Sequence, residues 1–247
     1  MTAPDPVRRA ALAERLARVR GRIATAAQAA GRSPADVSLV AVTKTFPASD
    51  VVLLGGLGLT DVAENKDQEA SAKAAAVAAE LGAGALRWHF VGRLQRNKVR
   101  SVVQYADVVE SVDRPELVAA LDRSASEYRK GPLDVLVQVN LDLDLDPSAG
   151  HGRGGVVAAE VPGLADAVAS APGLRLAGLM AVAPLGADPG AAFDRLASVA
   201  RRLHDDHPGA TVISAGMSGD LEAAVARGAT HVRVGTALLG GRSAPGG

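Results

Sequence analysis

Leu39-Val40-Ala41-Val42-Thr43-Lys44-Thr45 is a short apolar run that leads directly into a lysine, and residues 48–57 after it have the pattern of an amphipathic helix. A strand followed by a helix is the repeating unit of a parallel sheet. The same pattern recurs, with strands predicted near residues 38–43, 61–64, 87–91, 107–112, 133–140, 174–182, 211–215 and 231–235. Every strand except the last is followed by a predicted helix, at 48–57, 67–82, 95–105, 114–129, 156–171, 189–206 or 218–227, and after the last we expect only a short tail.

Eight strands in 247 residues predict an α/β protein built as a single (β/α)8 TIM-type barrel, a fold that needs about 250 residues. A doubly wound open sheet would show a similar alternation, so periodicity alone leaves both folds open. An extra helix is expected over residues 5–30, where apolar residues recur at helical spacing before the first strand. The repeat uses almost the whole chain, which predicts one domain over residues 1–247 with its core at about 10–242.

The composition agrees with a parallel sheet and excludes several functions. Hydrophobic residues make up 48% of the chain and aromatic residues only 2%, so the core must consist mainly of Ala, Val and Leu. Lys plus Arg and Asp plus Glu each total 27, which leaves no net field to attract nucleic acid or an anionic membrane. The chain has no cysteine, which excludes disulfides, thiolate metal sites and cysteine catalysis. With no signal-peptide pattern and no apolar run of about 20 residues, we expect a cytoplasmic protein without a membrane partner.

One loop is unusual, because Asp142, Asp144 and Asp146 alternate with leucines before a glycine-rich stretch. Alternating oxygen ligands are typical of calcium loops, but the glycine and the terminal glutamate of the EF-hand pattern are missing. We interpret the segment as a mobile surface loop and predict no metal site.

Lys44 is the first candidate for chemistry. Ligands bind at the C-terminal ends of barrel strands, which is where the strand before Lys44 ends. A lysine amine becomes a nucleophile toward carbonyl groups when partial desolvation or nearby positive charge lowers its pKa, and it then forms an imine. The alternative is an ordinary strand-end lysine that extends into water.

The segments after the last two strands could hold a phosphate. Ser214-Ala215-Gly216-Met217-Ser218-Gly219-Asp220 leads into the predicted helix 218–227, and Gly235-Thr236 ends the eighth strand. Glycines let backbone N–H groups approach an anion, and a helix N-terminus favours negative charge. Barrel enzymes often bind phosphate in these two loops. The alternative is a Gly-Ser turn in which Ser218 caps the helix.

Arg233 lies between two valines in the eighth strand, so it should point into the barrel if Val232 and Val234 face the helices. A buried guanidinium needs a partner, either a ligand or a buried carboxylate. Asn65 closes the second strand, and His89 lies on the third, where a lone histidine is more often a satisfied core group than a catalyst. These residues converge on one pocket only if the fold is the barrel.

Several motifs give the sequence a family resemblance over roughly residues 10–242. They are A-V-T-K-T, E-N-x-x-Q-E (Glu64–Glu69), R-W-H-F-V-G-x-L-Q-x-N-K (Arg87–Lys98), G-L-M (Gly178–Met180), G-M-S-G-D and V-R-V-G-T. In order and spacing the chain resembles the pyridoxal phosphate homeostasis proteins, small relatives of the alanine racemase barrel that belong to fold type III. The resemblance implies pyridoxal 5′-phosphate (PLP) as cofactor and Lys44 as its Schiff-base lysine.

Further roles follow from the same resemblance. It implies that Ser218, Gly235 and Thr236 bind the phosphate, with backbone help from Met217 and Gly219. It also implies that Arg233 faces the pyridine nitrogen and that Asn65 lies beside the ring, and we add His89 and Met180 to the cofactor-binding set. The departures from the family pattern are Lys66, Arg93 and the acidic run 142–146, and they concern the pocket rim and any partner surface, not Lys44.

The family implies a PLP carrier and regulator without strong catalytic activity. A guanidinium is only a donor, so a pyridine nitrogen facing Arg233 stays unprotonated and withdraws electrons poorly. We also expect no domain that could present a second base, and the tyrosines of the chain, Tyr105 and Tyr128, lie in predicted helices. We expect a monomer that binds PLP, with PLP-dependent apoenzymes as candidate partners. The alternatives are a slow amino-acid racemase, with Lys44 and either His89 or water as bases, and a cofactor-free Schiff-base aldolase.

Overall fold

The chain forms a closed barrel of eight parallel strands, paired in the order β1-β2-β3-β4-β5-β6-β7-β8 with β8 returning to β1. The computed structural model describes residues 5–142 and 154–241, and the acidic residues Asp144 and Asp146 of the unusual loop lie outside them. The strands are β1 Ser38–Val42, β2 Asp61–Glu64, β3 Arg87–Phe90, β4 Val108–Val112, β5 Leu133–Val139, β6 Leu174–Ala181, β7 Val212–Ser214 and β8 His231–Val234. Closure confirms the predicted barrel over the open sheet.

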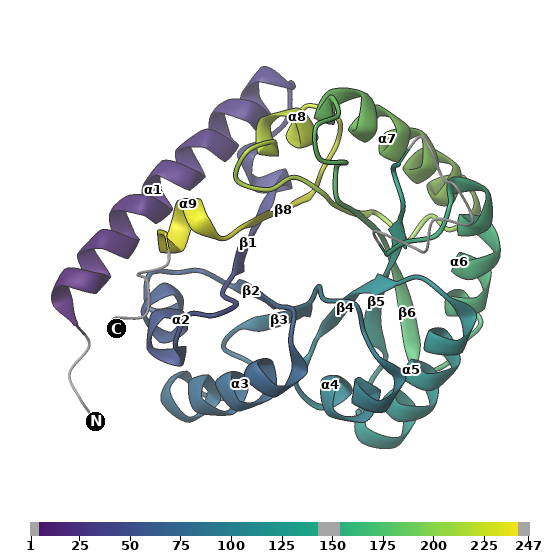
Figure 1. The fold of residues 1–247 in the computed structure, drawn as a ribbon, viewed down its shortest axis with the longest axis horizontal. Coiled ribbons are helices and arrows are strands. Elements are labelled where there is room, and N and C mark those ends of the chain that lie inside the picture. The colour runs from purple at the N-terminus through teal and green to yellow at the C-terminus, as the bar shows by residue number, and fades with distance from the viewer. Residues whose placement is uncertain (1–4, 143–153, 242–247) are drawn as a thin grey trace.

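Helices surround the barrel, as Figure 1 shows. In the described residues they are α1 Pro6–Ala29, α2 Ala48–Gly55, α3 Asp67–Leu81, α4 Val99–Tyr105, α5 Pro115–Tyr128, α6 Val161–Ala169, α7 Pro189–Asp206, α8 Leu221–Val225 and α9 Thr236–Leu239, with 3-10 turns at Pro34–Asp36, Arg96–Lys98 and Ala158–Glu160. Most match the predicted ranges, except that the 3-10 turns take up the starts of the helices expected at 95–105 and 156–171. None of these helices combines the length and hydrophobicity needed to cross a membrane.

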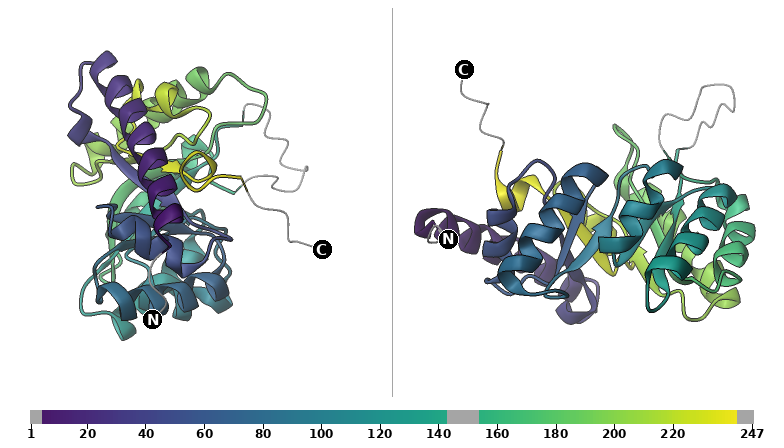
Figure 2. Two further views of the ribbon diagram at one scale, coloured as in Figure 1. Left: turned by 90° about the vertical axis from the view of Figure 1, so that its left-hand side faces the viewer. Right: turned by 90° about the horizontal axis from the view of Figure 1, so that it is seen from below.

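The extra N-terminal helix is confirmed. Helix α1 lies along the outside of the barrel beside α8 and α9 (Figures 1 and 2). Its buried stripe includes Leu12, Leu16, Val19 and Ile23, which belong to the same apolar cluster as residues of α2, α8 and β8. Burying such a stripe is what stabilises an amphipathic helix on a protein surface.

Two expectations about the end of the chain are wrong. The helix expected at 218–227 begins only at Leu221, because a turn joined by a hydrogen bond from the Met217 N–H to Asp220 Oδ1 (2.5 Å) comes first. The eighth strand is followed by a further short helix, α9, and not only by a tail. Helix α9 forms because Leu238 and Leu239 are buried beside α1, and the Leu239 carbonyl accepts a hydrogen bond from Arg15 (2.8 Å).

The glycine of the G-L-M motif, Gly178, occupies a position that requires glycine. Its φ of 151° lies in a region that other residues rarely adopt, and a Cβ there would lie 1.9 Å from the carbonyl oxygen of Val212 in β7. The pairing of β5 with β6 shifts register just before it, between Val135 and Leu136. Glycine therefore lets β6 and β7 approach at this irregular point.

Candidate functional site

Lys44 lies just past β1, in a turn at the C-terminal edge of the barrel, and is exposed. The pairing of Val42 with Ala63 places Asn65, two residues past Ala63, at the same edge. On the other side of β1, Val234 pairs with Ala41, so Gly235 lies beside Val42. A Cβ on Gly235 would lie 3.3 Å from the Val42 carbonyl oxygen. The barrel thus places Asn65 and the Gly235 segment just past the ends of β2 and β8, the two strands that adjoin β1.

The two predicted phosphate-binding loops are also neighbours. Ser214 of β7 pairs with His231 of β8, and the backbone N–H of Arg233 donates to the Gly216 carbonyl over 2.9 Å. The loop that carries Met217, Ser218 and Gly219 therefore lies next to the end of β8.

These loops offer unused donors. Within the described part of the chain, the backbone N–H groups of Ser218, Gly219, Gly235 and Thr236 have no protein acceptor. Such a set suits the phosphate of PLP, because oxyanions are held by converging backbone amides and hydroxyls. The alternative in which Ser218 caps the helix is wrong, because Asp220 occupies the N-cap position of α8.

The third β-α loop packs tightly against Asn65. A Cβ on Gly92 would lie 2.1 Å from the Asn65 carbonyl oxygen, so only glycine permits this approach. Lys66 and Arg93, which depart from the family pattern, line a cavity of about 370 Å³ next to Asn65. The two departures therefore lie together beside Asn65, and their place at the rim of a cofactor pocket stays a prediction.

Arg233 points into the barrel, as the alternation of β8 predicted. It is 4% exposed, whereas Val232 and Val234 belong to the apolar cluster that includes α1. Its guanidinium donates to Ser214 Oγ (2.6 Å) and to the Ala181 carbonyl (2.8 Å).

A buried carboxylate is the charged partner of Arg233, which was one of the two expected possibilities. Glu110 Oε2 lies 3.6 Å from the Arg233 Nη1 atom and accepts a hydrogen bond from the Ser214 hydroxyl over 2.6 Å. A guanidinium has five donors, so these contacts leave Arg233 able to donate to a ligand as well.

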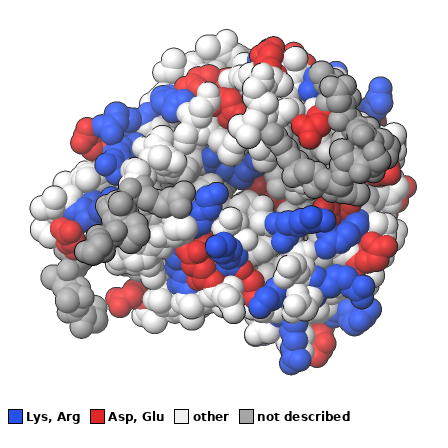
Figure 3. Space-filling view, in the orientation of Figure 1, with Lys and Arg blue, Asp and Glu red and all other residues white. Residues whose placement is uncertain are grey.

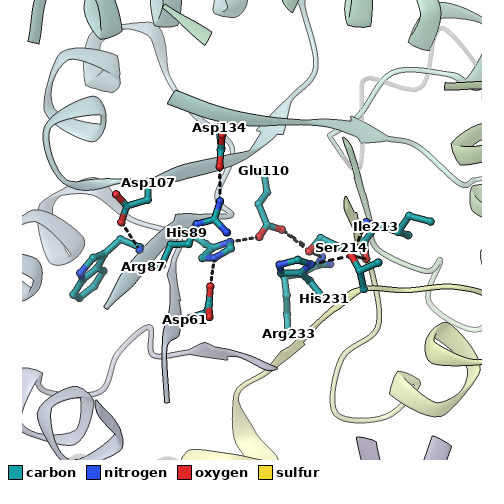
Figure 4. Close-up of polar contacts among 12 residues, drawn as sticks. Asp61, Arg87, His89, Asp107, Glu110, Asp134, Ile213, Ser214, His231 and Arg233 are labelled. Carbon is teal, nitrogen blue, oxygen red and sulfur yellow. Dashed lines mark hydrogen bonds and ion pairs between the residues drawn. The ribbon is translucent and has the colours of Figure 1, made fainter. Parts of the chain in front are cut away.

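His89 lies in the barrel interior and both of its ring nitrogens have partners. Nδ1 is 2.7 Å from Glu110 Oε1 and Nε2 is 3.1 Å from Asp61 Oδ1 (Figure 4). His89 is 2% exposed. Together with Asp61, Glu110, Ser214 and Arg233 it forms a buried network of hydrogen bonds and ion pairs that crosses the barrel. A histidine held in this way is not a free second base, and its predicted contact with the cofactor stays a prediction.

Met180 is also an interior residue. It is 2% exposed and packs with Val108 and Leu136. Its register partner on β7 is Ser214, which lies before the phosphate-binding loop. Its assignment to the cofactor site likewise stays a prediction.

Burial and polar contacts have opposite effects on the pKa values in this buried network. Burial alone would lower the pKa of His89, but its hydrogen bonds to Asp61 and Glu110 raise that pKa to about 8. Burial alone would raise the pKa of Glu110, but the hydrogen bond from His89 and the charges of His89 and Arg233 lower it to about 2. At neutral pH this buried network therefore holds the imidazolium of His89 beside the carboxylate of Glu110.

These pKa values predict how stability depends on pH. The contribution of His89 to the free energy of unfolding is complete below its unfolded pKa of about 6.5 and is lost as the pH rises through about 8. The contribution of Glu110 is complete above about 4.5 and is lost as the pH falls toward about 2. Urea unfolding between pH 6 and 9 should show a loss of about 2 kcal/mol that is absent in His89→Gln. An equal loss in both proteins would contradict the assignment.

Sequence reasoning did not single out Glu110 or Ser214 as functional residues. The available signal was a carboxylate inside the apolar strand Val108–Val112, where alternation turns it into the barrel. In the described residues, no group of three or more His, Asp or Glu side chains is arranged to hold a metal ion. Acidic and basic side chains are interspersed on the face shown in Figure 3.

The chain is similar to known proteins both in sequence and in structure. The sequence profile described as alanine racemase, N-terminal domain matches residues 15–243. A pyridoxal phosphate homeostasis protein of Mycobacterium tuberculosis is 47% identical over 252 residues, which cover 96% of this chain and 95% of the relative. An unknown protein from Bifidobacterium adolescentis superposes with a TM-score of 0.85 at 30% identity, covering 96% and 97% of the two chains. PipY of Synechococcus elongatus, solved with PLP bound, superposes with a TM-score of 0.74 at 34% identity, covering 93% and 100%.

Proposed function

The chain belongs to the alanine racemase N-terminal domain family and, among whole-chain relatives, to the pyridoxal phosphate homeostasis proteins, and we therefore propose that it binds PLP as a Schiff base on Lys44. We propose that it acts in PLP homeostasis as a carrier and regulator. Support comes from the shared edge of the barrel, where the exposed residue Lys44 lies just past β1, and the Gly235-Thr236 amides lie just past the adjoining strand β8.

Each group at this edge has a distinct role in the proposal. When bound, PLP supplies an aldehyde for the Schiff base and a pyridine ring that withdraws electrons. The amides of Ser218, Gly219, Gly235 and Thr236 hold the phosphate, and Arg233 donates a hydrogen bond to the pyridine nitrogen. Because Arg233 has no acceptor to offer, it favours the unprotonated nitrogen and weak electron withdrawal.

Weak catalysis is part of the same proposal. A racemase needs a second base opposite the lysine, and both nitrogens of His89 are occupied by Glu110 and Asp61. Tyr105 and Tyr128 are the last residues of α4 and α5. We further propose that the protein is a cytoplasmic monomer that supplies PLP-dependent apoenzymes, in keeping with its cysteine-free sequence and balanced charge.

Reduction of the protein with bound PLP tests the proposal. The purified protein mixed with PLP should show the absorption band of an imine, and borohydride should fix one cofactor on the peptide that contains Lys44. Peptide mass mapping reads out the position. A protein that stays colourless with PLP would favour the cofactor-free aldolase instead, and a label spread over other lysines would contradict a specific site.

A further inference from the structure

A buried lysine lies under the turn that carries Lys44. The Lys73 ammonium on α3 is within hydrogen-bonding distance of three acceptors: the Thr43 carbonyl (2.9 Å), Glu64 Oε1 (2.5 Å) and Glu69 Oε1 (2.9 Å). Lys73 is 6% exposed and Glu64 is completely buried. Three acceptors match the three hydrogens of an ammonium group, so this cation is fully used inside the protein.

The same cluster holds the backbone on both sides of Lys44. Before it, the Thr43 hydroxyl donates to Glu64 Oε1 over 2.6 Å, in addition to the bond from Lys73 to the Thr43 carbonyl. After it, the Thr45 N–H donates to Glu69 Oε1 over 2.5 Å. Both neighbours of Lys44 are therefore attached to the same group of charges, which Lys73, Glu64 and Glu69 form.

Thr45 has an unusual backbone conformation. Its φ of 69° lies in the left-handed region, and among the described residues it is the one residue other than glycine with a positive φ. A β-branched residue is unfavourable there and persists only when surrounding contacts hold it. The hydrogen bond to Glu69 is such a contact.

We propose that Lys73, together with Glu64 and Glu69, is a positioning group that holds the Lys44 turn in the geometry required for Schiff-base formation. The inference rests on the proposed function, because it assigns a task to Lys44. Lys73 does not touch the cofactor in this proposal, and it acts only through the backbone of Thr43 and through Glu69. The second glutamate of the E-N-x-x-Q-E motif thereby acquires a role that the motif alone does not reveal.

Glu69 is the best position for the test. Its side chain is 29% exposed, so replacing it should leave the fold intact, whereas removing Lys73 would strand the buried carboxylate of Glu64. Glu69→Ala removes the acceptor for the Thr45 N–H, and Glu69→Gln retains an oxygen that can accept it. Glu80→Ala, at an exposed position of the same helix, is the matched control.

The experiment compares two ligands. PLP can form the Schiff base, and pyridoxine 5′-phosphate, which has no aldehyde, can only bind non-covalently. We expect Glu69→Ala to weaken PLP binding about three- to tenfold, the range for one lost hydrogen bond. It should also slow the appearance of the imine band while leaving the dissociation constant for pyridoxine 5′-phosphate within about twofold of wild type. Glu69→Gln should restore most of the loss, and Glu80→Ala should behave like wild type.

Equal weakening of both ligands in Glu69→Ala would overturn the proposal, because it would indicate a general effect on the pocket. Unchanged PLP binding in that variant would overturn it as well. If melting curves show that Glu69→Ala is unfolded, Lys73→Arg takes its place, because a guanidinium keeps the charge but cannot reproduce the same three contacts, and the same selective loss is expected. Failure of the proposed function looks different, since wild type itself would then show no imine band.

Discussion

Replacing Lys44 with alanine is expected to abolish covalent retention of PLP while leaving the protein folded. Only a primary amine at this position can form the proposed Schiff base, and alanine has none. Lys44 is exposed and makes no hydrogen bond or ion pair in the described part of the chain, so its loss should change the free energy of unfolding by no more than about 0.5 kcal/mol. Intact mass after borohydride should show no bound cofactor in Lys44→Ala and one per chain in wild type.

Two control variants make this result specific. Lys66→Ala removes another exposed lysine at the same rim and should retain PLP as wild type does. Lys44→Arg keeps the positive charge but cannot form the imine, so it should fail like Lys44→Ala. Covalent retention of PLP by Lys44→Ala would show that another amine is the anchor, and the proposed site would then be wrong.

Replacing Glu110 with alanine is expected to lower the free energy of unfolding by about 3–5 kcal/mol, the cost of removing one partner from a buried ion pair. Glu110 is completely buried and accepts from His89 at one oxygen and from Ser214 at the other. Its loss would leave the guanidinium of Arg233 inside the barrel without a carboxylate. For a chain of this size the melting temperature should fall by roughly 6–20 °C.

An exposed ion pair provides the comparison for Glu110. Glu222 pairs with Arg22 on the surface over 2.7 Å, with half of its side chain exposed, so Glu222→Ala should cost no more than about 1 kcal/mol. Thermal melting of both variants at pH 6, where His89 is protonated, gives the contrast directly. Equal melting temperatures for the two variants would show that the buried network around Glu110 contributes little to stability.

Much of the fold could be predicted from the sequence because each strand carries its own signal. The third strand was expected at 87–91 and runs from Arg87 to Phe90, and the inward direction of Arg233 follows from its two valine neighbours. Prediction was weaker where local signals compete. The turn that precedes Leu221 uses a hydrogen bond from Met217 to Asp220, which hydrophobic periodicity does not register, and α9 is too short to show a period.

Neither buried cluster could be derived in the same way. The sequence indicated that Arg233 needs a partner, but it did not say that the partner is Glu110. Lys73 reads as one more residue of an amphipathic helix, and nothing local indicates that its ammonium reaches the Thr43 carbonyl, 30 residues earlier in the chain.

The strands and helices, the inward and outward faces of the strands, and the candidate lysine and glycine-rich loops could all be predicted from the sequence, because they depend on local periodicity and residue chemistry. Which charges meet inside the barrel became visible only in the folded protein. Closure brings Ser214 to Glu110 across 104 residues of sequence and sets His89 between Glu110 and Asp61. A buried charge is stable only beside a partner that the three-dimensional fold brings to it, and the separation of the two residues in the sequence does not predict the distance between them.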